Sequence, residues 1–157
     1  MKKTIQIIIG IIAFAFLIVI IKKNFFTDDN TQFYDKAWSA YENKQYETAI
    51  MYFNLIDKDK YPEILMPLGS SYLKIGNYNN AIQNLSKAYK IELGKKTDNY
   101  NKILNTLGVC YLEIKDLRQA RFYLEKALNE GNQNSLRNIQ ILDSLEQVQK
   151  NATDINQ

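Results

Sequence analysis

The 157-residue sequence has no histidine and only one cysteine, Cys110. Histidine is the commonest general base and a frequent metal ligand, so its absence excludes Ser–His and Cys–His catalytic pairs within the chain. A single cysteine allows neither an internal disulfide nor a cysteine cluster for zinc. Cys110 stands next to Tyr111 in a helical pattern, where we expect a small buried side chain, with a reactive or intermolecular thiol as the alternative.

Glycine and proline are also scarce, with six and two residues. The glycines are dispersed, and none begins a G-x-G-x-x-G or Walker-type phosphate loop. The run from Asp28 to Asn30 starts like a calcium loop but lacks its turn glycine and its terminal glutamate. Asp57 and Asp59 lie in a charged turn, where solvation is their expected role. We therefore predict no cofactor, no metal site and no enzymatic activity, unless a carboxylate pair is hidden in the fold.

Acidic residues are absent before Asp28, and that stretch holds four lysines, Lys2, Lys3, Lys22 and Lys23. From Asp28 on, 16 basic residues stand against 17 acidic ones, so the overall charge of +3 becomes −1 there. A nearly neutral region with scattered lysines lacks the basic patch of a nucleic-acid-binding protein. We expect neither a nucleic-acid partner nor a small-molecule substrate.

The four lysines flank an apolar run from Ile5 to Ile21, 17 residues in which Gln6 is the only strongly polar one. At ~1.5 Å per residue this run makes a helix of about 26 Å, somewhat short of a ~30 Å hydrocarbon core. Lysine side chains at both ends can cover the difference by reaching toward the membrane surface. Residues 1–23 are therefore predicted to be one transmembrane anchor.

A cleaved signal peptide is the main alternative, because the start is basic and the residues from Ala13 to Ala15 resemble a cleavage site. Cleavage there would leave an apolar run, Phe16 to Ile21, exposed at the new terminus, which favours an uncleaved anchor. A short basic start before an apolar run resembles a bacterial signal-anchor. We therefore expect the rest of the chain on the outer side of the cytoplasmic membrane, although lysines on both flanks leave the opposite orientation open.

An apolar pattern returns three times between Gln32 and Leu128, most clearly in the second and third copies. The second copy carries Leu65, Leu68, Gly69, Tyr72, Ala81, Leu85 and Ala88, and the third carries Leu104, Leu107, Gly108, Tyr111, Ala120, Leu124 and Ala127. The looser first copy has Phe33, Ala37, Ala40, Tyr46, Ala49, Phe53 and Ile56. Repetition at this period predicts stacked helix pairs, because a single pair cannot bury its apolar face alone.

The predicted organisation is a linker over residues 24–31 and an all-α domain over residues 32–150. Its parts are helix pairs at 32–61, 62–94 and 99–131, a capping helix at 135–150 and a disordered tail at 151–157. Pro67 requires the second pair to start late, near Ile64, or to kink locally. The wider spacing between the second and third copies predicts an extended loop around Gly94. The capping helix would carry Leu136, Ile139, Leu142, Leu145 and Val148 on one face.

These repeats resemble the tetratricopeptide repeat, a helix-turn-helix unit of about 34 residues. The resemblance covers roughly residues 32–131 and implies a superhelix in which Gly69 and Gly108 mark close helix contacts faced by Ala81 and Ala120. Arg121 departs from the family pattern, which more usually has isoleucine there. In this family, the first helices of successive pairs line a concave surface that binds peptides or protein segments.

The resemblance implies a concave partner-binding surface in this chain. Its residues would be Tyr34, Trp38, Tyr41, Met66, Ser70, Leu73, Lys74, Asn105, Val109 and Leu112. Trp38 is expected to contribute most, because tryptophan and tyrosine dominate binding hot spots; packing within the first pair is the alternative role. Few lysines or arginines occur there, so a partner segment with apolar anchors fits better than an acidic C-terminus.

The leading hypothesis is thus a membrane-anchored interaction module, a scaffold or assembly factor that docks a protein segment in its groove. A self-associating structural subunit of a membrane complex is the second hypothesis. It would use the convex face or the repeat ends.

Overall fold

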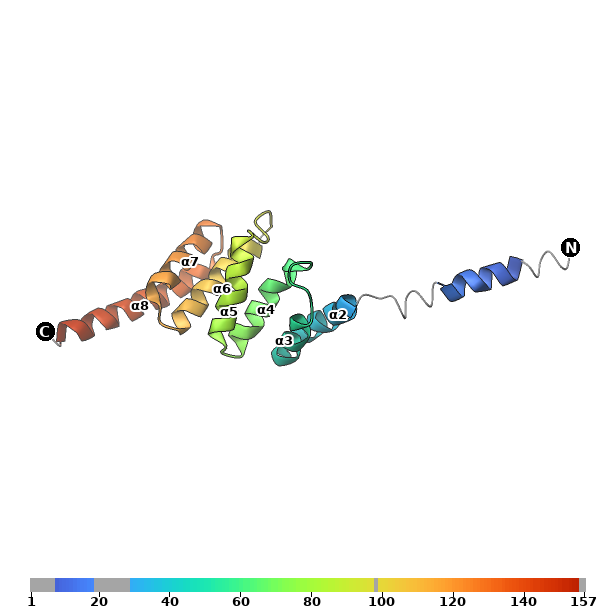
Figure 1. Ribbon diagram of the computed structural model, residues 1–157. Coiled ribbons are helices and arrows are strands. Elements are labelled where there is room, and N and C mark those ends of the chain that lie inside the picture. Colours follow the sequence, from blue (N-terminus) through green and yellow to red (C-terminus); the bar gives the residue numbers. More distant parts are fainter. Residues whose placement is uncertain (1–7, 19–28, 98, 156–157) are drawn as a thin grey trace.

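The computed structural model describes residues 8–18, 29–97 and 99–155, and all regular elements in these ranges are helices (Figure 1). A short helical segment covers residues 8–18. The domain consists of α2 (Asp29–Glu42), α3 (Tyr46–Asn54), the 3₁₀ helix η1 (Pro62–Ile64), α4 (Leu65–Lys74), α5 (Tyr78–Lys90), α6 (Asn99–Glu113), α7 (Leu117–Asn129) and α8 (Asn134–Ile155). The predicted all-α class is confirmed, and α2 starts inside the range expected for the linker.

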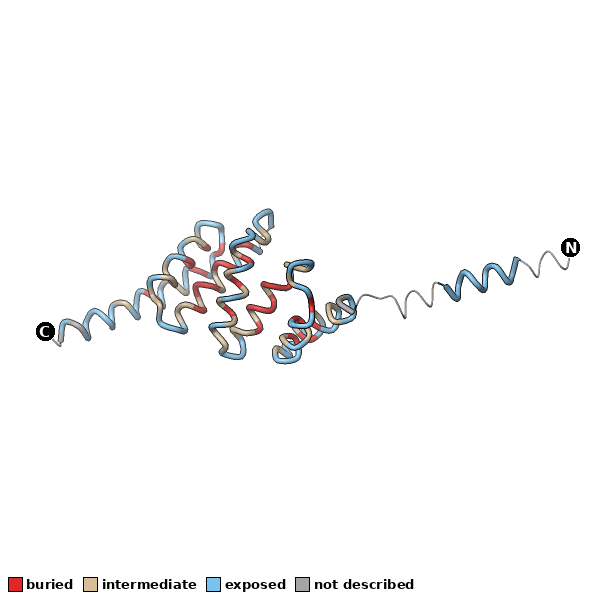
Figure 2. The backbone as a smooth tube through the Cα atoms, viewed as in Figure 1, coloured by how far each residue is buried: buried red, intermediate tan, exposed pale blue. Residues whose placement is uncertain are grey.

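Three helix pairs, α2 with α3, α4 with α5 and α6 with α7, stack in chain order, and α8 packs against α7. The first helices of the second and third pairs also touch, α4 with α6, and α6 touches the last helix, α8. The first helices thus form one layer and α3, α5 and α7 the other. Buried residues lie along the faces between helices (Figure 2). As expected of a repeat array, each pair supplies the apolar surface that covers the next.

The turn inside each pair uses one residue with positive φ, namely Lys44, Gly76 or Lys115. After it, Asn77 caps α5 by accepting a hydrogen bond from the Asn80 N–H at 3.3 Å, and Asp116 caps α7 in the same way. Such caps satisfy N–H groups that the helix itself leaves free. The repeated turn explains why the pairs resemble one another despite different residues.

Gly69 and Gly108 mark close helix contacts, as predicted. A Cβ at Gly108 would lie 2.5 Å from Cγ of Leu124, and one at Gly69 would lie 2.5 Å from Cγ of Leu85. Leucine side chains are the nearest groups at both contacts, in place of the predicted alanines, and the Ala81 carbonyl oxygen lies 3.3 Å from the Gly69 position. The space left by the absent side chain of each glycine is filled by a leucine side chain from the second helix of the same pair.

Of the two alternatives expected from Pro67, the structure has the late start of the α-helix and not a kink. Residues 62–64 form the 3₁₀ helix, and α4 begins at Leu65, so Pro67 lies in the first turn of the α-helix. Helix N–H groups have no intrahelical partner there, so the absent N–H of proline is tolerated. Pro67 is buried, which places its ring among the core side chains.

The expected end of the last helix was wrong. The last helix does not end near residue 150, because α8 runs on to Ile155 through most of the predicted disordered tail; residues 156–157 lie outside the described part. No glycine or proline follows Gly131, so nothing in this stretch stops a helix. Of the residues expected on the apolar face of this helix, Leu142 is buried, whereas Leu145 and Val148 are exposed.

Arg121 joins α8 to α7. Its guanidinium lies 2.6 Å from Oδ1 of Asp143 and 2.6 Å from Oε2 of Glu146 on α8, and 3.3 Å from Oε1 of Glu125 on its own helix. The matching position of the second pair is Ile82, which packs against the apolar core. Arginine replaces isoleucine here because the next helix offers carboxylates in addition to an apolar face.

Arg121→Ala should loosen α8 while the three pairs stay folded. Loss of this partly buried charged network is expected to cost about 1–2 kcal/mol, since hydrogen bonds to charged groups are stronger than exposed ion pairs. Hydrogen exchange should rise at the amides of α8 and remain unchanged in α4 and α5. Arg118→Ala, at an exposed position of α7, is the control. Equal protection of α8 in both variants would show that the ion pairs do not hold this helix.

Candidate functional site

A hollow of about 280 Å³ opens between α2, the start of α4 and the loop before α6. It is lined by side chains from all three parts: Trp38, Tyr41, Glu63, Met66, Pro67, Leu93, Gly94 and Asn99. Three of the predicted groove residues, Trp38, Tyr41 and Met66, therefore meet in one cavity. Its walls are mostly aromatic and apolar, as a site for a side-chain anchor requires.

Trp38 has both of the roles considered from the sequence. It lines the hollow, and its ring also lies 6.0 Å from the buried Phe53 ring at an interplanar angle of 86°. Its indole nitrogen is buried and has no hydrogen-bond partner among the residues that the structure describes. Removing Trp38 would therefore change stability and binding together, so Trp38→Ala cannot separate the two roles.

Tyr34 lies beside this hollow and belongs to the same aromatic cluster. Its ring is 6.0 Å from the Trp38 ring and 5.8 Å from the Tyr61 ring. Burial raises the pKa of the Tyr34 hydroxyl, and the nearby Glu63 carboxylate adds to the rise. The indole N–H of Trp38 acts against it but does not reach the geometry of a hydrogen bond. Tyr34 therefore remains a neutral phenol at physiological pH.

The other predicted groove residues are spread along the first-helix layer. Ser70, Leu73 and Val109 are half-buried and Lys74 is exposed. Leu112 packs against the small cluster that holds α8, so it supports the fold as well. These residues do not line the hollow, and their role in binding stays a prediction.

Asn105 is occupied within the protein. Its side-chain oxygen accepts hydrogen bonds from Ser135 Oγ and from Asn138 Nδ2, both at 2.9 Å. Both donors belong to α8, so this helix closes off the part of the surface where Asn105 lies. The predicted contact between Asn105 and a partner competes with these bonds.

Sequence reasoning missed five residues that line the hollow: Glu63, Pro67, Leu93, Gly94 and Asn99. Three of them belong to the long loop before α6 or to the first residue of that helix. The extra length between the second and third copies predicted the loop, but no local signal showed that it folds back toward α2. In this loop Gly94 has φ of 74°, and its carbonyl accepts a hydrogen bond from the Thr97 N–H at 2.8 Å.

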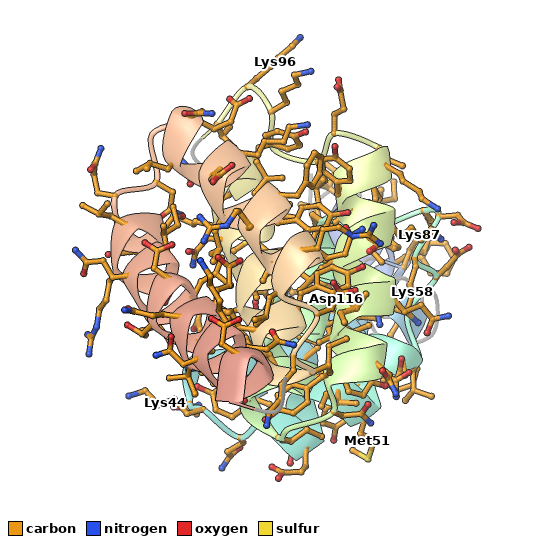
Figure 3. The ribbon with its side chains drawn as sticks, turned by 90° about the vertical axis from the view of Figure 1, so that its left-hand side faces the viewer. Lys44, Met51, Lys58, Lys87, Lys96 and Asp116 are labelled. Carbon is orange, nitrogen blue, oxygen red and sulfur yellow. The ribbon has the colours of Figure 1, made fainter. Side chains whose placement is uncertain are left out.

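The turn carboxylates do not form a catalytic pair. Asp57 Oδ1 accepts hydrogen bonds from the N–H groups of Asp59 and Lys60, while Asp59 pairs with Lys87 at 2.6 Å. Lys58 and Lys87 lie on the same side of the domain (Figure 3), and burial, followed by the charge of Lys87, lowers the pKa of Lys58. This charged turn links α5 to the end of the first pair. Within the described residues no His, Cys, Asp or Glu cluster has the makings of a metal site.

Cys110 is fully buried among α4–α7, and burial raises the pKa of its thiol to about 12. A thiol with that pKa remains protonated at neutral pH and is a poor nucleophile. The structure thus supports the core role over the reactive one.

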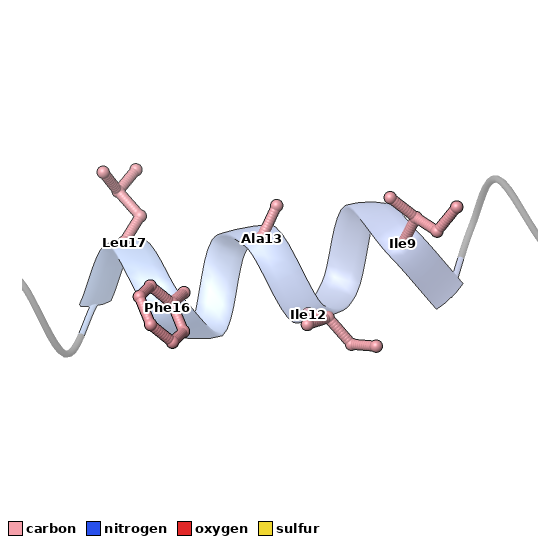
Figure 4. A pocket seen from close by; sticks show the side chains of 5 residues that line it. All are labelled: Ile9, Ile12, Ala13, Phe16 and Leu17. Atoms are coloured by element: carbon pink, nitrogen blue, oxygen red, sulfur yellow. The ribbon is translucent and has the colours of Figure 1, made fainter.

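The helical segment of residues 8–18 presents apolar side chains around its whole circumference. Ile9, Ile12, Ala13, Phe16 and Leu17 border a shallow hollow on this one helix (Figure 4). Every residue of the segment is exposed. Over residues 8–18, 29–97 and 99–155, we find no helix that combines the length and the apolar character needed to cross a membrane. The predicted anchor also includes residues 1–7 and 19–23, which lie outside the described residues.

Comparison with known proteins finds one family that part of the repeat region resembles. A family profile described as "Tetratricopeptide repeat" matches residues 61–129, the second and third pairs. The second and third helix pairs are therefore similar to tetratricopeptide repeats. The first pair lies outside the match, in agreement with its looser pattern, yet it stacks on the second pair in the same manner.

Solved structures show the same arrangement of helices. The TPR2AB domain of yeast Sti1 in complex with pHSP90 is 20% identical with a TM-score of 0.62; the alignment covers 78% of this chain and 50% of that chain. The N-terminal domain of stress-induced protein-1 (STI-1) from C. elegans is 17% identical with a TM-score of 0.61. The alignment covers 76% of this chain and 98% of the C. elegans chain. At these identities the likeness establishes a tetratricopeptide-like superhelix and nothing more specific. This chain spans half the length of the yeast chain, and no curated protein matches it in sequence.

Proposed function

We propose that this protein is a membrane-anchored interaction module that docks a segment of a partner protein in the hollow between α2, α4 and the loop before α6. The observation that carries the proposal is the hollow itself, whose walls come from three parts of the chain. The yeast structure, a complex with pHSP90, supports docking as a use of this fold. No bond is made or broken in this role, which is that of a scaffold or assembly factor.

The apolar N-terminus supports the membrane part of the proposal. Residues 8–18 leave Ile9, Phe14 and Phe16 more than 60% exposed, and water is a poor solvent for such a surface. A run from Ile5 to Ile21 with lysines at both ends fits a single span in the cytoplasmic membrane. We place the repeats on the extracytoplasmic side. Tethering raises the effective concentration of the module near membrane partners, so modest affinity is sufficient.

Site-specific photo-crosslinking tests the docking site in cells. A photoreactive residue at Met66 in the hollow should form a discrete adduct with one partner segment, which mass spectrometry can map. The same residue at Met51, which is 53% exposed on α3 in the other layer, is the matched control and should give no such adduct. Equal adducts at both positions, or none at Met66, would contradict docking in the hollow.

Self-association through α8 is a second candidate function, favoured by one observation. The last turns of α8 project beyond the other helices (Figure 1), and Ile141, Leu145 and Val148 are 47%, 41% and 66% exposed. Their spacing of four and three residues places them in one stripe, the pattern through which helices pair.

A cysteine in this stripe tests the second candidate. Val148→Cys should give a covalent dimer in membranes after mild oxidation if two copies pair through α8, whereas Lys150→Cys on the opposite side of the helix should not. The native Cys110 is fully buried and does not interfere. The absence of a dimer from Val148→Cys would exclude this mode of pairing.

A further inference from the structure

The side chains that line the hollow carry a single negative charge and no positive one. Among its eight lining residues Glu63 is the only one with a charged side chain, and none is a lysine or arginine. Lys95 and Lys96, from the same loop as Leu93, line a separate hollow together with Glu130. The hollow is therefore a weakly negative, mostly apolar space.

The aromatic walls add to this negative character. The rings of Trp38 and Tyr41 lie 6.0 Å apart in an edge-to-face contact with an interplanar angle of 88°, and both residues line the hollow. The face of an aromatic ring is the negative part of its charge distribution. Cations are attracted to such faces within about 6 Å of the ring centre, most strongly for tryptophan.

The neighbouring cluster already holds a cation of the protein itself. Nζ of Lys60 lies 5.2 Å from the centre of the Tyr61 ring, and Tyr61 contacts Tyr34, which contacts Trp38. This contact lies outside the hollow, because neither Lys60 nor Tyr61 lines it. Trp38 and Tyr41 in the hollow are aromatic residues, like the neighbouring Tyr61 that contacts the Lys60 ammonium group.

The size of the hollow indicates what enters it. Its volume of about 280 Å³ is just under the ~300–1,000 Å³ of pockets for drug-sized ligands. It is suited to one long side chain of a docked segment. The apolar walls at Met66, Pro67 and Leu93 would contact a hydrocarbon stem, and Glu63 would meet a charged end.

We infer that this hollow binds an arginine side chain of the docked partner segment, with the guanidinium against Trp38 and Tyr41 and paired with Glu63. This inference rests on the proposed docking function and names the anchor. Arginine is favoured over lysine, because its planar guanidinium stacks on aromatic rings and pairs with carboxylates through two hydrogen bonds. The preference is opposite in charge to that of a groove for acidic segments.

Trp38 is the only tryptophan, so its fluorescence reports binding in the full chain. The chain would be held in a maltoside detergent, whose headgroup carries no cation. The probes are three capped pentapeptides, Ala-Leu-X-Leu-Ala, in which X is arginine, norleucine or glutamate. We expect the arginine peptide to bind about tenfold more tightly than the norleucine peptide, within the range of a partly desolvated cation–π contact, and the glutamate peptide not to bind.

Glu63→Gln should reduce the preference for arginine over norleucine to about threefold. Glu47→Gln, at an exposed position of α3, is the matched control and should keep the full preference. Equal affinity for the arginine and norleucine peptides would overturn the inference while leaving docking in place. If none of the peptides changes Trp38 emission, both the arginine anchor and docking in this hollow are overturned.

Discussion

Phe53→Ala is expected to lower the free energy of unfolding of the first helix pair by about 3–5 kcal/mol, the usual cost of truncating a buried phenylalanine. Phe53 is fully buried in the cluster of α2, α3 and α4. Its ring contacts Trp38 and Tyr41 edge to face, at 6.0 and 6.4 Å between ring centres. The substitution removes both the buried surface and the support behind the aromatic walls of the hollow.

Because repeats are stabilised mainly by their neighbours, this loss should be local. In a denaturant titration of the full chain, Trp38 fluorescence should change at lower denaturant than far-UV circular dichroism, which reports all helices. In the native sequence the two transitions should lie closer together. Met51→Ala is the control, since Met51 projects from the surface of the same helix (Figure 3) and is 53% exposed. A Phe53→Ala transition that coincides with that of Met51→Ala would contradict the assigned core.

The second large effect concerns the membrane. The double variant Ile12→Lys with Phe16→Lys should move the chain from the membrane fraction to the soluble fraction. Each lysine near the centre of a spanning helix costs about 2.5–3.5 kcal/mol of insertion free energy on the biological scale, and the predicted span is already short. Both side chains belong to the exposed apolar segment, so their replacement leaves the core of the repeat domain untouched.

Membrane fractionation after alkaline carbonate extraction measures this change. The conservative variant Ile12→Leu with Phe16→Leu should remain in the membrane pellet, because its apolar surface is nearly unchanged. A lysine variant that still resists extraction would show that the N-terminal segment is not what anchors the chain. Soluble behaviour of both variants and of the native chain would exclude anchoring altogether.

The helix pairs were predictable because their signals are local. Alanines, leucines and tyrosines recur at helical spacing, and a polar or glycine-containing break separates the two helices of each pair. Gly69 and Gly108 were correctly assigned to close contacts, although leucines fill the contacts in place of the predicted alanines. The late start at Pro67 also followed from a local rule, the position at which a helix tolerates a missing N–H.

The end of α8 was predicted less well because two weak local signals compete there: the polar composition favours disorder, and the lack of a helix-stopping residue favours a longer helix. Residues after Lys150 are polar, which suggested disorder, but they contain no residue that stops a helix. The helix continues to Ile155. Arg121 was recognised as a departure from the repeat, but its three carboxylate partners lie partly on a helix more than 20 residues away.

Local sequence determined the helical pairs, their stacking order and the apolar character of the N-terminus, because each depends on spacing and composition within a few turns of helix. Tertiary structure decided which of the groove residues share a cavity. Trp38, Met66 and Asn99 are far apart in the chain and line one hollow. They meet only because the first two pairs stack and the long loop before α6 folds back. No pattern in the sequence encodes that loop conformation, which depends on contacts between residues distant in the chain.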